Sequence, residues 1–102
     1  MSDDNQDIQP AARPEPLPEL EIELPEPITL GGKTYNSITL REPRLKDLEA
    51  GVNAARGCTG AEADMKQMKA LIASVADVPR QVVENLSARK FREAGDYFGG
   101  FF

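Results

Sequence analysis

Hydrophobic and polar residues alternate on both sides of a pair of glycines, Gly31–Gly32, in the first half of the chain. Alternation with a period of two is typical of a half-buried β-strand, and Gly-Gly favours a two-residue turn because both positions tolerate positive φ. The pattern therefore predicts a β-hairpin in which Ile28 lies opposite Tyr35. The alternation slips after Tyr35, and either a bulge at Asn36–Ser37 or a strand that begins there explains the slip.

The spacing of the hydrophobic residues changes from two to three and four at Pro43, which indicates that a helix follows the hairpin. Proline suits the first turn of a helix and Gly57 limits its length, so we expect the helix to run from Pro43 to about Arg56. Small residues at Gly51 and at three alanines would let a second helix approach closely. The hydrophobic residues that recur on one side are Leu45, Leu48, Val52 and Ala55.

Three further helices are predicted after a loop at residues 56–60. Thr59 and Glu62 have the spacing of a capping box, so the second helix should start near Gly60. Its hydrophobic stripe consists of Ala61, Met65, Met68, Leu71, Ile72 and Val75. Asp77–Val78–Pro79 marks the next boundary, with Asp77 as a candidate cap of a short third helix, and Ser87 can cap a fourth helix.

The third helix carries Val82, Val83 and Leu86, and the fourth carries Phe91, Ala94 and Phe98 on one side. The predicted fold class is therefore mainly α with a small β-hairpin (α+β), in which an N-terminal two-stranded hairpin precedes three to four short helices.

The first 27 residues differ in composition from the rest of the chain. They contain six of the eight prolines and eight of the seventeen acidic residues but a single base, so their formal charge is −7. We predict a disordered, acidic, proline-rich leader over residues 1–27 and one domain over residues 28–102. The leader is either a solvated spacer or a peptide that docks on a partner, because Leu17, Leu20, Ile22 and Leu24 are more apolar than a spacer requires. Leu24 can also extend the first strand.

The domain carries no obvious catalytic or nucleic-acid-binding chemistry. Its eleven bases and nine acids leave it close to neutral, and no basic stripe supports binding to nucleic acid. The chain has no histidine and one cysteine, Cys58, which excludes a zinc site or a Cys/His catalytic pair. Two acid pairs, Asp47 with Glu49 and Glu62 with Asp64, are expected on the solvated surface. We therefore predict a non-enzymatic protein without a cofactor.

The amino terminus is acidic where a signal peptide requires bases, and no apolar run approaches the length of about 18 residues that a membrane span needs. These features predict a soluble cytoplasmic protein that does not enter a membrane.

A domain of this size has a small core, and such domains often need a partner or a second copy. We therefore expect a homo-oligomer with an apolar surface for another protein. Methionine adapts to irregular partners, and exposed apolar patches mark interaction sites. The candidate protein-binding residues are Met65, Met68, Leu71, Ile72, Phe91, Phe98, Phe101 and Phe102. The last two either fold back onto the helices or remain exposed.

The order of these motifs resembles the tail assembly chaperone family of long-tailed bacteriophages, the type found in Mu-like and related contractile-tailed phages. The resemblance covers residues 22–102. Lys90 departs from the family pattern, which has an acid just before the aromatic residue of the last helix. The matching residues are Ile28-Thr-Leu, Ile38-Thr-Leu-Arg-Glu-Pro, Asp47-Leu48, Leu71-Ile72-Ala73, Pro79, Val83, Leu86, Phe91 and the terminal aromatic residues.

The resemblance implies a chaperone of the host-cell cytoplasm that binds the long helical tape measure protein. Such a chaperone keeps the tape measure protein soluble while tail tube subunits polymerise around it, and it is absent from the mature virion. The family also implies a longer, frameshifted form of the same chain as a second partner. The alternative is a non-enzymatic phage structural or adaptor protein, such as a tail-completion or DNA-associated protein.

Overall fold

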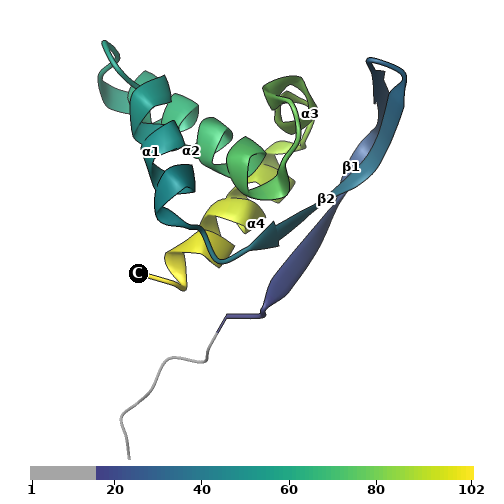
Figure 1. Ribbon diagram of the computed structural model, residues 1–102, viewed down its shortest axis with the longest axis horizontal. Helices are drawn as coiled ribbons and strands as arrows, with labels where there is room; N and C mark the ends of the chain where they lie inside the picture. Colours follow the sequence, from purple (N-terminus) through teal and green to yellow (C-terminus); the bar gives the residue numbers. More distant parts are fainter. Residues whose placement is uncertain (1–15) are drawn as a thin grey trace, which may run out of the picture.

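A computed structural model describes residues 16–102 and shows an antiparallel β-hairpin followed by four helices (Figure 1). The hairpin consists of β1 (Glu19–Leu30) and β2 (Lys33–Arg41). The helices are α1 (Leu45–Ala54), α2 (Gly60–Ala76), α3 (Arg80–Glu84) and α4 (Ala88–Gly99). This element order confirms the predicted α+β fold class. Most of the expected leader, residues 1–15, lies outside the described residues.

The hairpin turn has the geometry that its two glycines favour. Gly31 and Gly32 have φ values of 57° and 78°, and both belong to the region that glycine adopts without strain. The strands pair in the expected register, with Ile28 opposite Tyr35. Thr29 Oγ1 and Thr34 Oγ1 lie 3.0 Å apart on the exposed face of the turn. In Figure 1 the turn projects beyond the helices, at the end of a long arm.

Strand β1 begins at Glu19, so the prediction that residues up to 27 belong to a disordered leader was wrong for residues 19–27. Glutamates alternate there with hydrophobic residues, which gives the segment an apolar face, and Ile22 pairs with Ile38 in the core. The two prolines of this segment fall in a bulge, where residues 24–27 lie opposite Asn36 alone, so neither proline stands at a paired position of the ladder. The slip in the sequence pattern is therefore a bulge in a continuous hairpin, with its extra residues on β1.

Helix α1 begins at Leu45, and its predicted hydrophobic side is only partly covered, since Leu48 packs against the core while Leu45 and Val52 face outward. Leu45 is 71% exposed and Val52 57% exposed, whereas Asp47 and Gly51 face the interior. The reason is the close approach of α1 to α2, because a Cβ atom at Gly51 would lie 3.0 Å from the carbonyl oxygen of Gln67. The prediction that small residues admit a neighbouring helix is confirmed, and this close contact determines which side of α1 is buried.

Asp47 is fully buried, so its predicted place on the solvated surface was wrong. Its carboxylate accepts hydrogen bonds from Arg41 Nη1, from the backbone N–H of Arg44 and from the hydroxyl of Ser74. Burial alone would raise the pKa of Asp47, but these hydrogen bonds outweigh burial and hold its pKa below the usual value. One side chain thereby joins the end of β2, the start of α1 and the last turn of α2.

The core lies where the hairpin meets α2, α3 and α4, with α2 packed on β2 and α4 on β1. Its fully buried side chains include Leu40, Ile72, Val82 and Phe98. Ser87 caps α4 as predicted, since its hydroxyl accepts a hydrogen bond from the N–H of Lys90.

Two other predicted caps differ from the structure. Thr59 occupies the N-cap position of α2 but makes no side-chain cap hydrogen bond. Asp77 ends α2 in the left-handed conformation, at φ 57°, instead of starting α3. The N–H of Val78 donates to the carbonyl of Ala73 in this turn, which satisfies a carbonyl at the helix end.

The two terminal phenylalanines behave differently. Phe101 is half-buried, and its ring meets the ring of Tyr97 edge-on at 5.2 Å between centroids, whereas Phe102 is 66% exposed. The hydroxyl of Tyr97 donates a 2.7 Å hydrogen bond to the carbonyl of Leu17. Burial, followed by the charges of Glu19 and Glu42, raises the pKa of Tyr97, so the hydroxyl keeps the proton that it donates.

Candidate protein-binding groove

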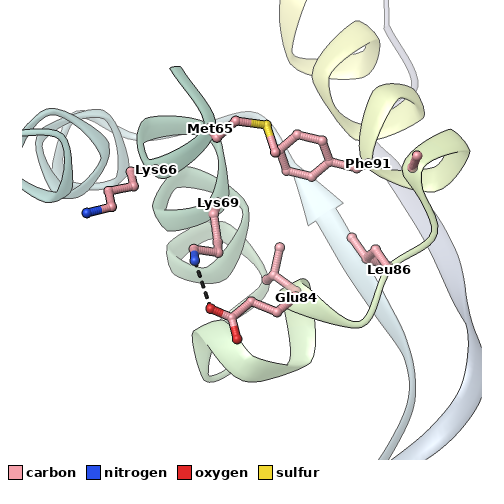
Figure 2. A pocket seen from close by; sticks show the side chains of 8 residues that line it. Met65, Lys66, Lys69, Glu84, Leu86 and Phe91 are labelled. Carbon is pink, nitrogen blue, oxygen red and sulfur yellow. Dashed lines mark hydrogen bonds and ion pairs between the residues drawn. The ribbon is translucent and has the colours of Figure 1, made fainter. Parts of the chain in front are cut away.

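An apolar groove of about 500 Å³ lies between α2, α3 and the start of α4. Its centre is hydrophobic, and charged side chains stand at the edge formed by α2 and α3 (Figure 2). The lining residues are Met65, Lys66, Lys69, Val83, Glu84, Leu86, Ala88 and Phe91.

The lengths of the helices create this groove. Helix α2 spans 17 residues, but its buried side chains lie in its second half, from Ala70 to Val75. Helix α3 spans only five residues, and the chain turns into α4 soon after it ends. The first half of α2 therefore extends past the core, and Met65 remains 59% exposed.

Met65 and Phe91 form the centre of the apolar surface. Figure 2 shows the thioether of Met65 pointing toward the ring of Phe91, a favourable kind of contact for a polarizable sulfur. The same two side chains also line a neighbouring hollow of about 350 Å³, together with Met68 and Gly95. The apolar surface thus continues on both sides of the Met65–Phe91 contact.

The charged edge is held in place by ion pairs. Lys69 Nζ lies 2.7 Å from Glu84 Oε2, which links α2 to α3 across one side of the groove. Lys66 Nζ lies 3.4 Å from Glu62 Oε2 on the same helix. The proximity of Cys58, and then that of Glu62, raises the pKa of Lys66.

An apolar centre with a charged edge suits the binding of an apolar stripe on another polypeptide. Over residues 16–102, no group of three or more histidine, cysteine, aspartate or glutamate side chains is arranged to hold a metal ion. None of the helices in this part of the chain is both long enough and apolar enough to span a bilayer.

The structure places the eight predicted binding residues in three different environments. Met65 and Phe91 line the groove, and half-buried Met68 lines the adjoining hollow. Phe101 and Phe102 lie beyond the other end of α4. The remaining three, Leu71, Ile72 and Phe98, belong to the core and do not reach the surface.

Several residues of the groove were not among the predicted binding residues. Leu86 was assigned to the face of the third helix, but it lies in the connection to α4 and turns one side toward the groove. The short interval between Pro79 and the Ser87 cap is the signal in the sequence that α3 would be too short to cover α2.

The comparisons with known proteins support one family. The family model described as "Phage tail assembly chaperone proteins, E, or 41 or 14" matches residues 21–102. That range includes almost the whole hairpin and all four helices. No curated protein and no solved structure matches the chain.

Proposed function

The chain belongs to the phage tail assembly chaperone family, and on that basis we propose that it binds the tape measure protein and keeps it soluble during assembly of the tail tube. The family suggests a non-enzymatic protein, and the proposed role requires only reversible binding in the host cytoplasm. The proposed partners are the tape measure protein, a second copy of the chain and its longer, frameshifted form.

The apolar groove is the observation that carries this proposal. Met65, Leu86 and Phe91 come from three different segments and leave a hydrophobic surface uncovered at their junction. Amphipathic helices bind in such grooves by inserting side chains that recur every three or four residues. A long helical partner would offer this stripe repeatedly, and the groove would shield one section of it from water.

The size of the groove agrees with a transient complex. The groove is formed by three short segments, and a helix seated in it would contact fewer residues than the about 20–30 on each side of a stable interface of standard size. Weak binding suits a chaperone that leaves before the tail is complete. The net charge of −5 contributes to the solubility of the free protein.

Co-expression with the tape measure protein of the same gene cluster tests the proposal. We expect the wild-type chain to hold the tape measure protein in the soluble fraction and to co-purify with it. Met65→Glu should abolish both effects, because it places a charge in the apolar centre of the groove. Val52→Glu is the matched control, since Val52 is 57% exposed and Met65 59% exposed, but Val52 lies on α1, outside the groove.

The proposal fails if the tape measure protein stays insoluble with the wild-type chain, or if Met65→Glu performs as well as the wild type. Mass spectrometry of purified particles provides a second readout. We expect the chain to be absent, and its presence in stoichiometric amounts would identify a structural component of the virion instead.

A further inference from the structure

Helix α1 carries an apolar stripe on the side that faces away from the core. The stripe consists of Leu45, which is 71% exposed, and Val52, which is 57% exposed. A rotation of about 100° per residue brings these two side chains to nearly the same direction, two helical turns apart. Asp47 and Gly51 occupy the buried side of the same helix. Large apolar side chains that share an exposed helix face are typical of a surface that another segment covers.

Charged side chains surround this stripe, and most of them are bases. The exposed charged residues between positions 44 and 56 are Arg44, Lys46, Glu49 and Arg56. Within residues 16–102, none of these three bases forms a salt bridge. The surface around the stripe therefore carries an excess of positive charge, which favours an acidic segment that also brings an apolar side chain.

The acidic N-terminal segment, residues 1–15, joins the described part of the chain close to this surface. The hydroxyl of Tyr97 donates a 2.7 Å hydrogen bond to the carbonyl of Leu17, which fixes the chain just after this segment. Pro18 lines the same hollow as Arg44, the residue that precedes α1. Eight residues in an extended polyproline-like geometry cover about 25 Å, whereas a ten-residue helix is about 15 Å long. Residues 1–15 are therefore long enough to follow the whole of α1.

The order of residues in the two segments is complementary. Read away from the junction, residues 1–15 include, in this order, an acid, a base, an apolar residue and an acid: Glu15, Arg13, Ile8 and Asp7. Read away from its start, the exposed side of α1 and of the turn after it includes a base, an acid, an apolar residue and a base: Lys46, Glu49, Val52 and Arg56. Each charge in one row thus meets the opposite charge in the other, and the apolar residues meet between them.

We propose that residues 1–15 lie along the exposed side of α1 and cover its apolar stripe, with Ile8 against Val52 and Asp7 beside Arg56. Exposed ion pairs are individually weak and are screened by salt, so this contact is a reversible cover that shields the stripe from water. The family match begins at residue 21, so the cover is a feature of this chain outside the matched range. The inference goes beyond the proposed function and does not depend on it, because the groove lies elsewhere, between α2, α3 and α4.

Nuclear magnetic resonance of the full chain, with a nitroxide spin label on Gln9→Cys, tests this contact. Cys58→Ser removes the native thiol, so the label is attached at one position. The label broadens the signals of nearby amides, and we expect the strongest broadening at Leu45 and Val52 and little at Gly31 in the hairpin turn. Added salt should weaken the broadening of α1. When the spin label and the isotope label are on different chains in a mixture, α1 should show no broadening, because the contact lies within one chain.

Charge variants of the spin-labelled chain identify the pairing. Asp7→Lys should remove most of the broadening at Val52, and adding Arg56→Glu should restore it, because the pair is then reversed. Asp3→Lys is the matched control, since it changes the net charge equally but lies outside the proposed pair, so most of the broadening should remain. The amide spectrum of each variant shows that it is folded.

Four results would overturn the contact: uniform broadening over residues 16–102, broadening centred on the groove at Met65 and Phe91, equal broadening of α1 in the mixed sample, or equal effects of Asp7→Lys and Asp3→Lys. In the third case the segment binds a second copy instead of its own α1. Failure here leaves the proposed function intact, because that function depends on the groove and is tested by Met65→Glu in co-expression.

Discussion

Asp47 connects three elements through one carboxylate. It is fully buried, and its partners come from β2, from the N-cap of α1 and from α2. A buried carboxylate is costly to desolvate, so its contribution depends on keeping all of these hydrogen bonds. The side chain of Arg41 is 30% exposed, which leaves this base partly hydrated if its partner is lost.

Replacement of the charge tests this role. Asp47→Asn should lower the free energy of unfolding by about 2–3 kcal/mol, because the amide is neutral and its NH₂ group cannot accept a hydrogen bond. Glu49→Gln is the control on the same helix, where Glu49 is exposed, and its effect should stay within about 0.5 kcal/mol. Urea denaturation of both variants measures the difference, and equal effects would contradict the assigned role.

The same carboxylate predicts a pH dependence. The folded-state pKa of Asp47 is lowered, so its stabilising effect is complete above the unfolded-state pKa of about 3.9 and is lost as the pH falls through the folded-state value. The gap in stability between the wild type and Asp47→Asn should therefore be constant near neutral pH. It should narrow on acidification below about pH 4.

At the level of elements, the sequence predicted which segments form helices and where they are capped better than it predicted which side of each element is buried. The Gly31–Gly32 turn, the Ser87 cap and the stripe of α4 follow from local chemistry and were predicted correctly. The buried side of α1 was not, because the close contact of Gly51 with Gln67 depends on tertiary packing. The start of β1 was also missed, because prolines argue against a strand unless a bulge accommodates them.

Two cap residues with similar sequence signals should differ in their effect on stability. Ser87 accepts a hydrogen bond from the N–H of Lys90, whereas Thr59 makes no side-chain cap hydrogen bond. Ser87→Ala should therefore cost about 1 kcal/mol, and Thr59→Ala only a few tenths. Thermal unfolding followed by circular dichroism compares the two variants. A larger loss for Thr59→Ala would show that the α2 cap is the stronger one.

Prediction of the candidate site was also limited, because the exposure of its side chains depends on tertiary packing. The hydrophobic stripe of α2 identifies one side of that helix but not how much of its length is covered. Met65 remains exposed because α3 is short, while Leu71 and Ile72 on the same stripe are buried by the core. Periodicity therefore predicted Met65 and Phe91 as surface residues together with core residues that share their spacing.

For the whole molecule, the main feature is incomplete burial. The core is shared among a two-stranded hairpin and four helices, and it leaves an apolar groove on one side of α2 and an apolar stripe on α1. Exposed apolar surfaces of this kind mark interaction sites in soluble proteins. The central claim is that this chaperone holds its client through the groove between α2, α3 and α4.

Hydroxyl-radical footprinting of the purified complex with the tape measure protein tests that claim most directly, because the method reports the solvent exposure of individual side chains. We predict that Met65 and Phe91 lose reactivity on binding, while Phe102, beyond the far end of α4, keeps its reactivity. A complex in which Met65 and Phe91 react as they do in the free chain would contradict the claim.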